Sequence, residues 1–215
     1  MSQLKVGQIW QSRYLIEKVL GQGGMGIVYG AIDQHNDNKR CAVKILLKHR
    51  LKRLHYRRRL LAEIDMMQRL DHPHIVQVYD VFKGDGQTDV PYLVMEQLEG
   101  ENLGELISRG DRITVRDCLK LIQQALSALE YAHRQGVIHR DLKPENLFLC
   151  SAADGQKYLK VLDFGVAKDL TSNLSLTASL DFPMIGTPHY MAPEQIRNQK
   201  AAPSCDVYAM GVIIW

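Results

Sequence analysis

The chain has 215 residues, of which 46% are hydrophobic and 24% charged, and 27 Lys and Arg against 24 Asp and Glu give a net charge of +3. This mixture excludes a disordered chain, and so small a net charge does not by itself indicate a nucleic-acid-binding protein. The four cysteines are scattered without a C-x-x-C pair, which leaves zinc and dithiol motifs unsupported and fits a reducing compartment. Because this chain contains neither a leader-like apolar segment nor a run long enough to span a bilayer, we expect a cytoplasmic protein, leaving open a membrane anchor beyond residue 215.

The first hundred residues contain five short runs that are typical of β-strands. These runs are residues 14–20, 27–32, 41–47, 75–82 and 91–96. Between the third and the fourth run, apolar side chains recur at i, i+3 and i+4 over 54–70, which predicts a helix. The sequence therefore predicts an antiparallel five-stranded lobe with one main helix over 1–97, and a hinge at 98–100.

The second half, 98–215, is predicted to be a mainly helical lobe. Thr114 and Asp117 form a T-x-x-D capping signal, and Gly136 marks the end of the long helix that follows. We expect the buried stripe of this helix to consist of Val115, Leu119, Ile122, Ala125, Leu126, Leu129 and Ala132. A further apolar helix begins near Asp206 and runs to the end of the chain. Because its apolar side chains need a covering layer, we expect this lobe to be incomplete and truncated within that helix.

A predicted β-hairpin brings two metal-binding side chains together. Its strands are 146–150 and 158–162, and Asp154-Gly155 is a strong turn dipeptide between them. Asn146 and Asp163 lie symmetrically about this turn, so an antiparallel hairpin places them at the same end. A carboxylate and an amide oxygen side by side suit a hard divalent cation such as Mg²⁺.

Two features of the first lobe allow more than one interpretation. The glycine cluster at 21–26 is followed by a strand and not by a helix, which argues against a dinucleotide-binding fold. It is either a flexible turn or a hairpin tip whose backbone N–H groups face phosphates. Lys44 shares a strand face with Ala42 and Leu46, and Glu63 lies on a mostly apolar helix face. These two charges form either an ion pair or two separate snorkelling side chains.

Five stretches of the sequence occur in a characteristic order: GQGGMGIV (21–28), AVK (42–44), HRDLKPEN (139–146), DFG (163–165) and APE (192–194). With them the sequence resembles the eukaryotic-type (Hanks-type) protein kinase family, from about Tyr14 to Trp215. GQGGMGIVY and GTPHYMAPEQ look most like the bacterial Ser/Thr kinases of this type. The resemblance implies a bilobal α+β protein-kinase fold and ATP-dependent phosphoryl transfer to Ser/Thr hydroxyls of proteins.

The resemblance also implies roles for the charged residues named above. Lys44 would hold the α- and β-phosphates of ATP, and Glu63 would orient Lys44. Asn146 and Asp163 would hold Mg²⁺, and Asp141 would accept the proton of the substrate hydroxyl. Catalysis would then consist mostly of positioning and charge neutralisation.

Further positions are implied in the same way. Lys143 would steady the transferred phosphoryl group, and Thr187 would contact Asp141 and Lys143. The ATP site would combine the glycine-rich loop, an apolar sandwich for adenine, a gatekeeper and two backbone positions along the adenine edge. The loop positions are Leu20, Gly21, Gln22, Gly23, Gly24 and Gly26, and the adenine sandwich consists of Val28, Ala42 and Phe148. The gatekeeper is Met95, and the backbone positions along the adenine edge are Glu96 and Leu98.

Regulation is expected at the activation loop and at a basic run. Arg140 would pair with phosphate on Thr177 or Ser179, added by autophosphorylation within a homodimer. Residues 48–59 hold seven Lys and Arg and no acid. They form either a solvated face or a docking surface for an acidic or phosphorylated partner, while nucleic acid is not expected without aromatic stacking residues. His72-Pro-His74 is expected to make loop hydrogen bonds, because no third metal ligand is placed beside it.

Two classes of function therefore remain open from the sequence. The first is an active ATP-dependent Ser/Thr protein kinase, favoured because all the catalytic side chains are present. The alternative is a truncated, non-catalytic nucleotide-binding or interaction module of kinase fold. Phosphotransfer from ATP and Mg²⁺ to a generic acceptor, with Asp141→Asn as control, discriminates between them.

Overall fold

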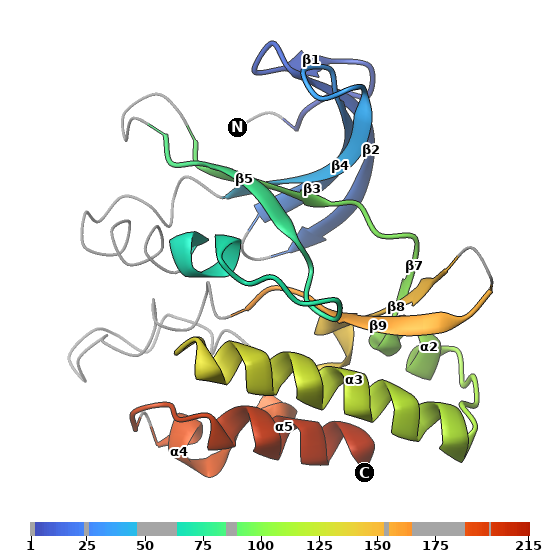
Figure 1. The fold of residues 1–215 in the computed structure, drawn as a ribbon, viewed down its shortest axis with the longest axis vertical. Coiled ribbons are helices and arrows are strands. Elements are labelled where there is room, and N and C mark those ends of the chain that lie inside the picture. The colour runs from blue at the N-terminus through green and yellow to red at the C-terminus, as the bar shows by residue number, and fades with distance from the viewer. Residues whose placement is uncertain are drawn as a thin grey trace. The chain divides into compact units, whose positions relative to one another are not determined.

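The computed structural model describes residues 3–23, 26–46, 64–84, 90–152, 155–164, 188–197 and 199–215 (Figure 1). The chain forms two compact units, Met1–Arg69 with Gln77–Leu98, and Leu70–Val76 with Glu99–Trp215. Residues 70–76, which the predicted boundary at 97 assigns to the first lobe, thus group with the second unit. No helix in these described ranges is long and apolar enough to cross a bilayer.

The first unit is built on an antiparallel sheet with the strand order β1-β2-β3-β4-β6-β5. Its strands are β1 Ile9–Trp10, β2 Tyr14–Gly23, β3 Gly26–Asp33, β4 Lys39–Leu46, β5 Val78–Phe82 and β6 Tyr92–Glu96. The five predicted strands are all present, and the meander of β2, β3 and β4 is antiparallel as expected. The sixth strand, β1, was not predicted, because two residues are too short to show a period of two. Of the helix predicted over 54–70, residues 64–68 are described and are helical.

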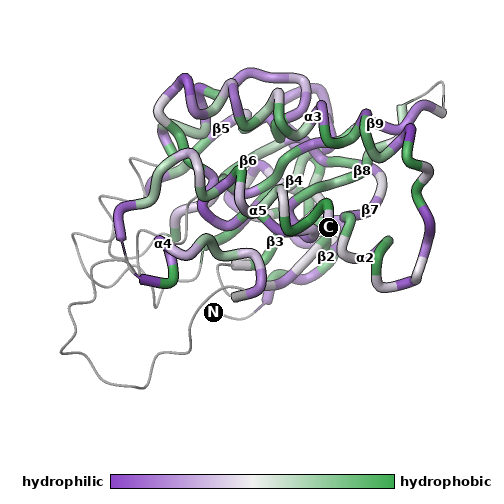
Figure 2. The backbone as a smooth tube through the Cα atoms, turned by 90° about the horizontal axis from the view of Figure 1, so that it is seen from below, coloured by the Kyte–Doolittle hydropathy of each residue, from purple (hydrophilic) through white to green (hydrophobic). Residues whose placement is uncertain are grey.

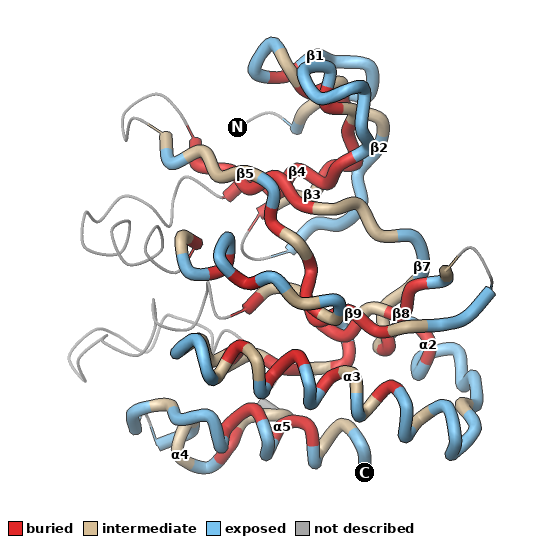
Figure 3. The backbone as a smooth tube through the Cα atoms, viewed as in Figure 1, coloured by how far each residue is buried: buried red, intermediate tan, exposed pale blue. Residues whose placement is uncertain are grey.

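An aromatic cluster packs against one face of this sheet. Tyr14 is fully buried, and the Trp10 and Tyr92 rings meet edge to face with centroids 4.6 Å apart. Val43 and Val94, which pair across β4 and β6, belong to the same cluster. Figure 3 shows the central strands of the sheet as mostly buried. Because successive side chains alternate between faces, the neighbours of Val43 on β4 lie on the opposite face.

The second unit contains the strands β7 Gly100–Asn102, β8 Leu147–Ser151 and β9 Lys157–Val161, paired in that order. Its helices are α2 Leu103–Ser108, α3 Val115–Arg134, α4 Pro193–Ile196 and α5 Ser204–Ile214, with single 3-10 turns at Pro144–Asn146 and Pro188–Tyr190. The expected apolar C-terminal helix is α5, which is largely hydrophobic in Figure 2. Of its side chains, Val207 and Ile214 are exposed, whereas Ala209 and Met210 are buried.

The ends of α3 follow the sequence signals, but its buried face differs from the predicted one. The Thr114 hydroxyl accepts a hydrogen bond from the Asp117 amide, and Gly136 adopts φ +76° just beyond the C-cap. The buried residues are Leu121, Ala125, Ala128, Leu129 and Ala132. Val115, Leu119 and Leu126 were expected in this stripe, yet they are exposed. The helix carries apolar residues on two faces, and periodicity alone does not tell which one is covered.

Residues 70–76 run beside β9 within the second unit. Ile75 forms a parallel bridge with Val161, and the Lys160 ammonium donates to the Ile75 carbonyl at 3.2 Å. The His72 ring stacks on Tyr131 with a centroid distance of 5.2 Å, and its Nδ1 accepts from the His74 amide at 3.2 Å. These contacts confirm the expected loop hydrogen bonding by the two histidines.

Candidate active site

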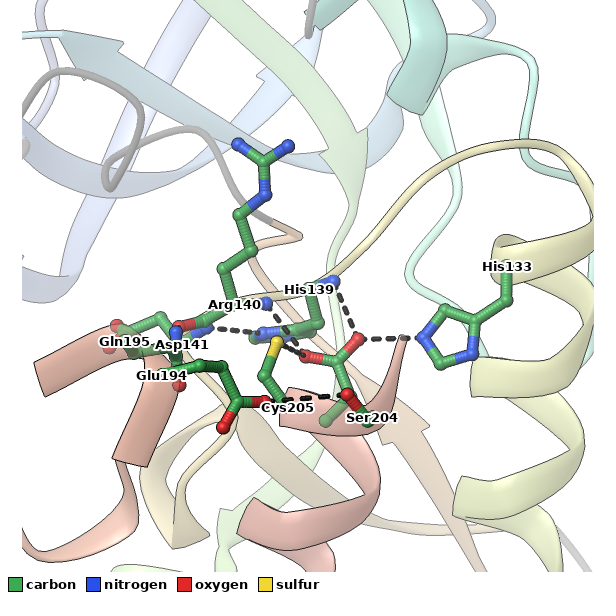
Figure 4. Close-up of polar contacts among 9 residues, drawn as sticks. His133, His139, Arg140, Asp141, Glu194, Gln195, Ser204 and Cys205 are labelled. Atoms are coloured by element: carbon green, nitrogen blue, oxygen red, sulfur yellow. Dashed lines mark hydrogen bonds and ion pairs between the residues drawn. The ribbon is translucent and has the colours of Figure 1, made fainter. Parts of the chain in front are cut away.

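The stretch HRDLKPEN forms a loop whose backbone is bonded to one buried carboxylate, that of Asp206 at the start of α5. Figure 4 shows His133, His139 and Arg140, which donate to this carboxylate. Asp206 is 1% exposed. Its Oδ2 accepts from the His139 amide at 2.8 Å and from His133 Nε2 at 2.7 Å, and its Oδ1 accepts from the Arg140 amide at 2.8 Å. Two of these three donors are backbone amides of the loop, so the carboxylate holds the loop backbone in place.

The electrostatics of Asp206 match this role. Burial alone would raise the pKa of its carboxyl, but the hydrogen bonds from His133 and from the two loop amides outweigh burial and hold the pKa below its ordinary value. The neighbouring Cys205 thiol donates to Asp206 at 3.7 Å. Burial, together with this carboxylate, raises the pKa of Cys205 to about 12, so the thiol stays protonated and unreactive.

Three side chains of the loop lie around the Asp141 carboxylate and its peptide group. The Lys143 ammonium is 3.9 Å from Asp141 Oδ2, and both side chains are partly exposed. Asn146 is buried, and its Nδ2 donates to the Asp141 carbonyl at 2.7 Å. The Asp141 amide donates to the His139 carbonyl at 2.8 Å, and the His139 Nδ1 lies 3.3 Å from the same amide. The carboxylate is thereby oriented beside a cation at the surface of the second unit.

The β8–β9 hairpin brings Asn146 close to Asp163, with a register one residue away from the predicted one. The Leu162 amide donates to the Asn146 carbonyl at 2.9 Å, so Asn146 lies opposite Leu162 and Asp163 follows directly. The His139 Nε2 donates to the Leu162 carbonyl at 2.7 Å, and the His139 ring contacts Phe164 with centroids 4.8 Å apart. The sequence argument missed this register because it used only the midpoint between Asn146 and Asp163, whereas the type and length of the turn set the register.

The donor set at this end of the hairpin fits Mg²⁺. The Asn146 amide nitrogen is directed at the Asp141 carbonyl, so its amide oxygen is the atom that a cation would meet, and Asp163 would add a carboxylate. Mg²⁺ is commonly held by one or two such protein oxygens together with substrate phosphates and water. Within the described ranges, there is no cluster of three or more His, Cys, Asp or Glu that could hold a metal without substrate oxygens.

In the first unit, the residues expected around the nucleotide share the sheet face opposite the aromatic cluster. Lys44 is 6% exposed and pairs with Val28 on β3 and with Leu93 on β6, and Ala42 pairs with Met95. Directly paired residues of antiparallel strands lie on the same face. The geometry thus places Val28, Ala42, Lys44 and Met95 together on one surface.

The glycine-rich hairpin tip is described on both of its strands. Gly23 pairs with Gly26, and a Cβ atom at Gly26 would lie 2.1 Å from the Ile45 carbonyl oxygen, so only glycine fits there. Leu20, Gly21 and Gln22 are exposed on β2. Gly21, Gly23 and Gly26 thus present backbone without side chains on the two strands of this hairpin, which is the property required of a phosphate-binding loop.

The remaining predicted positions lie at the end of β6, in the second unit or outside the described residues. Glu96 is the last residue of β6 and Leu98 lies two residues further on, and the Glu96 amide donates to the Gln77 carbonyl at 3.0 Å. Phe148 lies on β8 of the second unit, where it pairs with Lys160. The positions Gly24, Glu63, Thr177, Ser179, Thr187 and the basic run 48–59 lie outside the described residues.

Two residues of the site were not found from the sequence. His133 is in the last turn of α3, where a histidine commonly serves the helix dipole, and nothing local indicates its bond to Asp206. Gln195 directly follows the APE motif, and its Nε2 donates to the Arg140 carbonyl at 2.9 Å. Both act across more than fifty residues of sequence, so only the folded chain reveals them.

The fold, the glycine-rich hairpin and the HRDLKPEN loop together define a protein kinase domain. Residues 14–215 match the protein kinase domain family, and the chain belongs to it.

Two bacterial serine/threonine-protein kinases are similar to the chain in sequence. The chain is 35% identical over 210 residues to the serine/threonine-protein kinase PrkC of Bacillus subtilis, which covers 98% of this chain and 31% of PrkC. It is 35% identical over 213 residues to the serine/threonine-protein kinase PknA of Mycobacterium tuberculosis, which covers 97% of this chain and 47% of PknA. The chain thus spans 31% to 47% of the length of these relatives.

Solved structures share the fold. The Mycobacterium tuberculosis PknI kinase domain superposes with a TM-score of 0.75 at 27% identity, over 99% of this chain and 76% of that one. The structure of Rad53 in complex with AMP-PNP superposes with a TM-score of 0.72 at 28% identity, over 94% of this chain and 47% of that one. Both likenesses extend over nearly all of the chain, so they concern both units.

Proposed function

We propose that the chain transfers the γ-phosphoryl group of ATP to Ser or Thr hydroxyls of protein substrates. The observation that carries the proposal is the Asp141 carboxylate, 3.9 Å from the Lys143 ammonium, on a loop fixed by Asp206. Family membership and the names of the bacterial relatives support the same reaction. A non-catalytic nucleotide-binding module would have no need of this oriented carboxylate.

The residues of the second unit would act on the phosphoryl acceptor. Asp141 would accept a hydrogen bond from the attacking hydroxyl, orient its lone pair toward the γ-phosphorus and take up its proton as the bond forms. Lys143 would face the negative charge on the transferred oxygens. Asn146 and Asp163 would hold Mg²⁺, whose charge would offset that of the phosphates.

The residues of the first unit would bind the nucleotide. Lys44 would meet the α- and β-phosphates, with Glu63 as its expected partner, and the tip at 21–26 would cover the phosphates with backbone N–H groups. The shared face of Val28, Ala42 and Met95 supports an apolar adenine site, to which Phe148 and the backbone of Glu96 and Leu98 would contribute. The nucleotide analogue in the Rad53 structure supports ATP as the donor.

Regulation by phosphate is part of the proposal. Arg140 directly precedes Asp141, so phosphate on Thr177 or Ser179 paired with Arg140 would order the activation loop next to the catalytic loop. Thr187 would contact Asp141 and Lys143 in that ordered state. A homodimer for autophosphorylation, an acidic or phosphorylated partner at 48–59 and a cytoplasmic location are further expectations from the sequence.

Phosphotransfer is tested with γ-labelled ATP, MgCl₂ and a generic basic acceptor protein. We expect the unaltered chain to label the acceptor on Ser and Thr, and Asp141→Asn to lose nearly all labelling while it still binds a fluorescent ATP analogue. Asp111→Asn is the matched control, because Asp111 is exposed and its carboxylate pairs with Arg109 at the surface. Nucleotide binding without transfer by the unaltered chain contradicts the proposal and supports the non-catalytic module.

A further inference from the structure

Gln195 connects the segment after the APE motif to the catalytic loop through both ends of its side-chain amide, and Figure 4 shows Gln195 beside Arg140 of that loop. Its Oε1 accepts from the Ala192 amide at 3.1 Å, which caps α4. Its Nε2 donates to the Arg140 carbonyl at 2.9 Å, 55 residues away in sequence. The cap explains only the first of these bonds, because an oxygen alone serves an N-terminal cap. The second bond therefore calls for an explanation of its own.

The bonded carbonyl belongs to a strained residue. Arg140 adopts φ +64°, a left-handed conformation that costs a non-glycine residue about 1–3 kcal/mol and persists only where the surroundings enforce it. The Arg140 amide is held by Asp206 at 2.8 Å, and its carbonyl is held by Gln195. The two bonds come from α5 and α4, so both peptide groups of this residue are anchored by other elements.

The Arg140 carbonyl lies in the same rigid plane as the Asp141 amide. Because a peptide group is planar, the bond from Gln195 sets the rotation of the unit from which the Asp141 side chain projects. The Asp141 amide is bonded at the other end of this plane to the His139 carbonyl. Asp141, Lys143 and Gln195 also line one small hollow of the second unit. Loss of the Gln195 donor would free the plane to turn and would move the carboxylate.

We propose that Gln195 is a positioning residue for phosphoryl transfer, which holds the Arg140–Asp141 peptide plane and links the segment 192–195 to the orientation of Asp141. The inference rests on the proposed kinase activity for its catalytic readout. It also predicts a property of the loop that does not depend on activity, namely the protection of its backbone amides.

Gln195→Glu keeps the bond from the Ala192 amide and removes the bond to the Arg140 carbonyl. The carboxylate still accepts from the Ala192 amide, but it has no proton for the Arg140 carbonyl and repels it. We expect kcat to fall about 10- to 100-fold, the range for displacing a catalytic group by around 1 Å, with the KM for ATP changed less than about twofold. We expect the hydrogen exchange of the amides at 139–141 to accelerate, with the midpoint of global unfolding little changed.

Two further variants make the test specific. Gln195→Met has a similar shape and adds no charge, but it lacks both the donor and the acceptor, so the lost donor predicts a fall in kcat at least as large as that of Gln195→Glu. Gln199→Glu introduces the same charge at an exposed position four residues further on, and it should behave like the unaltered protein. A normal kcat and normal amide exchange in Gln195→Glu would overturn the inference, and so would a defect that Gln195→Met does not share. If the unaltered chain has no kinase activity, the proposed function fails, while amide exchange still decides whether Gln195 holds the loop.

Discussion

Replacing Asp206 by Asn is the sharpest perturbation of the catalytic-loop anchor. The side chain keeps its size, but one of the two oxygens becomes an NH₂ group. The best rotamer keeps an oxygen at the Oδ2 position, which serves two donors, His139 and His133, and places the NH₂ group opposite the Arg140 amide. Two donors then face each other in a site that is 1% exposed, where water cannot replace the lost acceptor.

The expected loss of stability follows from these bonds. A hydrogen bond to a charged group contributes about 1.5–3 kcal/mol, and a buried donor without an acceptor costs about 1–3 kcal/mol. The sum indicates a decrease of about 2.5–6 kcal/mol in the free energy of unfolding, which brackets the roughly 3–5 kcal/mol for removing one partner of a buried charge pair. That is a large part of the roughly 5–15 kcal/mol that stabilises a typical domain.

Urea unfolding followed by tryptophan fluorescence measures this loss, with Asp111→Asn as an exposed Asp-to-Asn control whose effect should stay below about 1 kcal/mol. The pKa of Asp206 is held below its ordinary 3.8, so its contribution is complete above that pH and is lost as the pH falls through the folded-state pKa. The difference between the unaltered protein and Asp206→Asn should therefore shrink below pH 3.8. A loss of less than 1 kcal/mol at neutral pH would show that the three bonds do not anchor the loop.

Two further predictions concern other buried or partly buried groups. Within the described part of the chain the fully buried Tyr14 hydroxyl has no hydrogen-bond partner, so Tyr14→Phe should raise the free energy of unfolding by about 1 kcal/mol, and a lower urea midpoint would contradict this. Burial and the charges of His74 and Lys160 hold the pKa of His72 below 6.5, so the folded state binds fewer protons than the unfolded state and stability falls as the pH drops through 6.5. His72→Asn keeps an acceptor for the His74 amide and should weaken the dependence of the urea midpoint on pH below 6.5. An unchanged pH dependence would exclude His72 as its cause.

The fold was predictable to the extent that local patterns decide it. The strands of the first unit alternate or carry β-branched runs, and Thr114 and Gly136 mark the ends of α3, so these elements follow from short-range physics. The covered face of α3 was not predictable, because Leu119 and Leu126 are as apolar as Leu129 and only packing distinguishes them. Burial is a property of the tertiary structure, and the helical period only limits which residues can share a buried face.

In the candidate site, too, local sequence predicts some residues and only the tertiary structure reveals the others. Asp141, Lys143 and Asn146 are close in sequence, and the structure keeps them close, so their grouping follows from the loop itself. His133 and Gln195 join the site through hydrogen bonds that span many residues, and neither carries a local signal for this role. Motif reasoning thus finds the groups that perform chemistry more readily than the groups that hold them in place.

The backbone conformations explain why so much of the second unit serves one loop. Arg140 and Asp163 adopt φ +64° and +51°, and neither is a glycine, so each conformation is unfavourable by itself. Arg140 is held by bonds from α4 and α5. Asp163 follows Leu162 just beyond β9, and Leu162 is bonded to both His139 and Asn146. No single element could enforce both conformations. Asp141 thus follows a residue held by bonds from two different elements of the second unit, and a change at Asp206 or Gln195 would act on the proposed catalysis through backbone angles, although neither side chain is assigned a contact with the substrate.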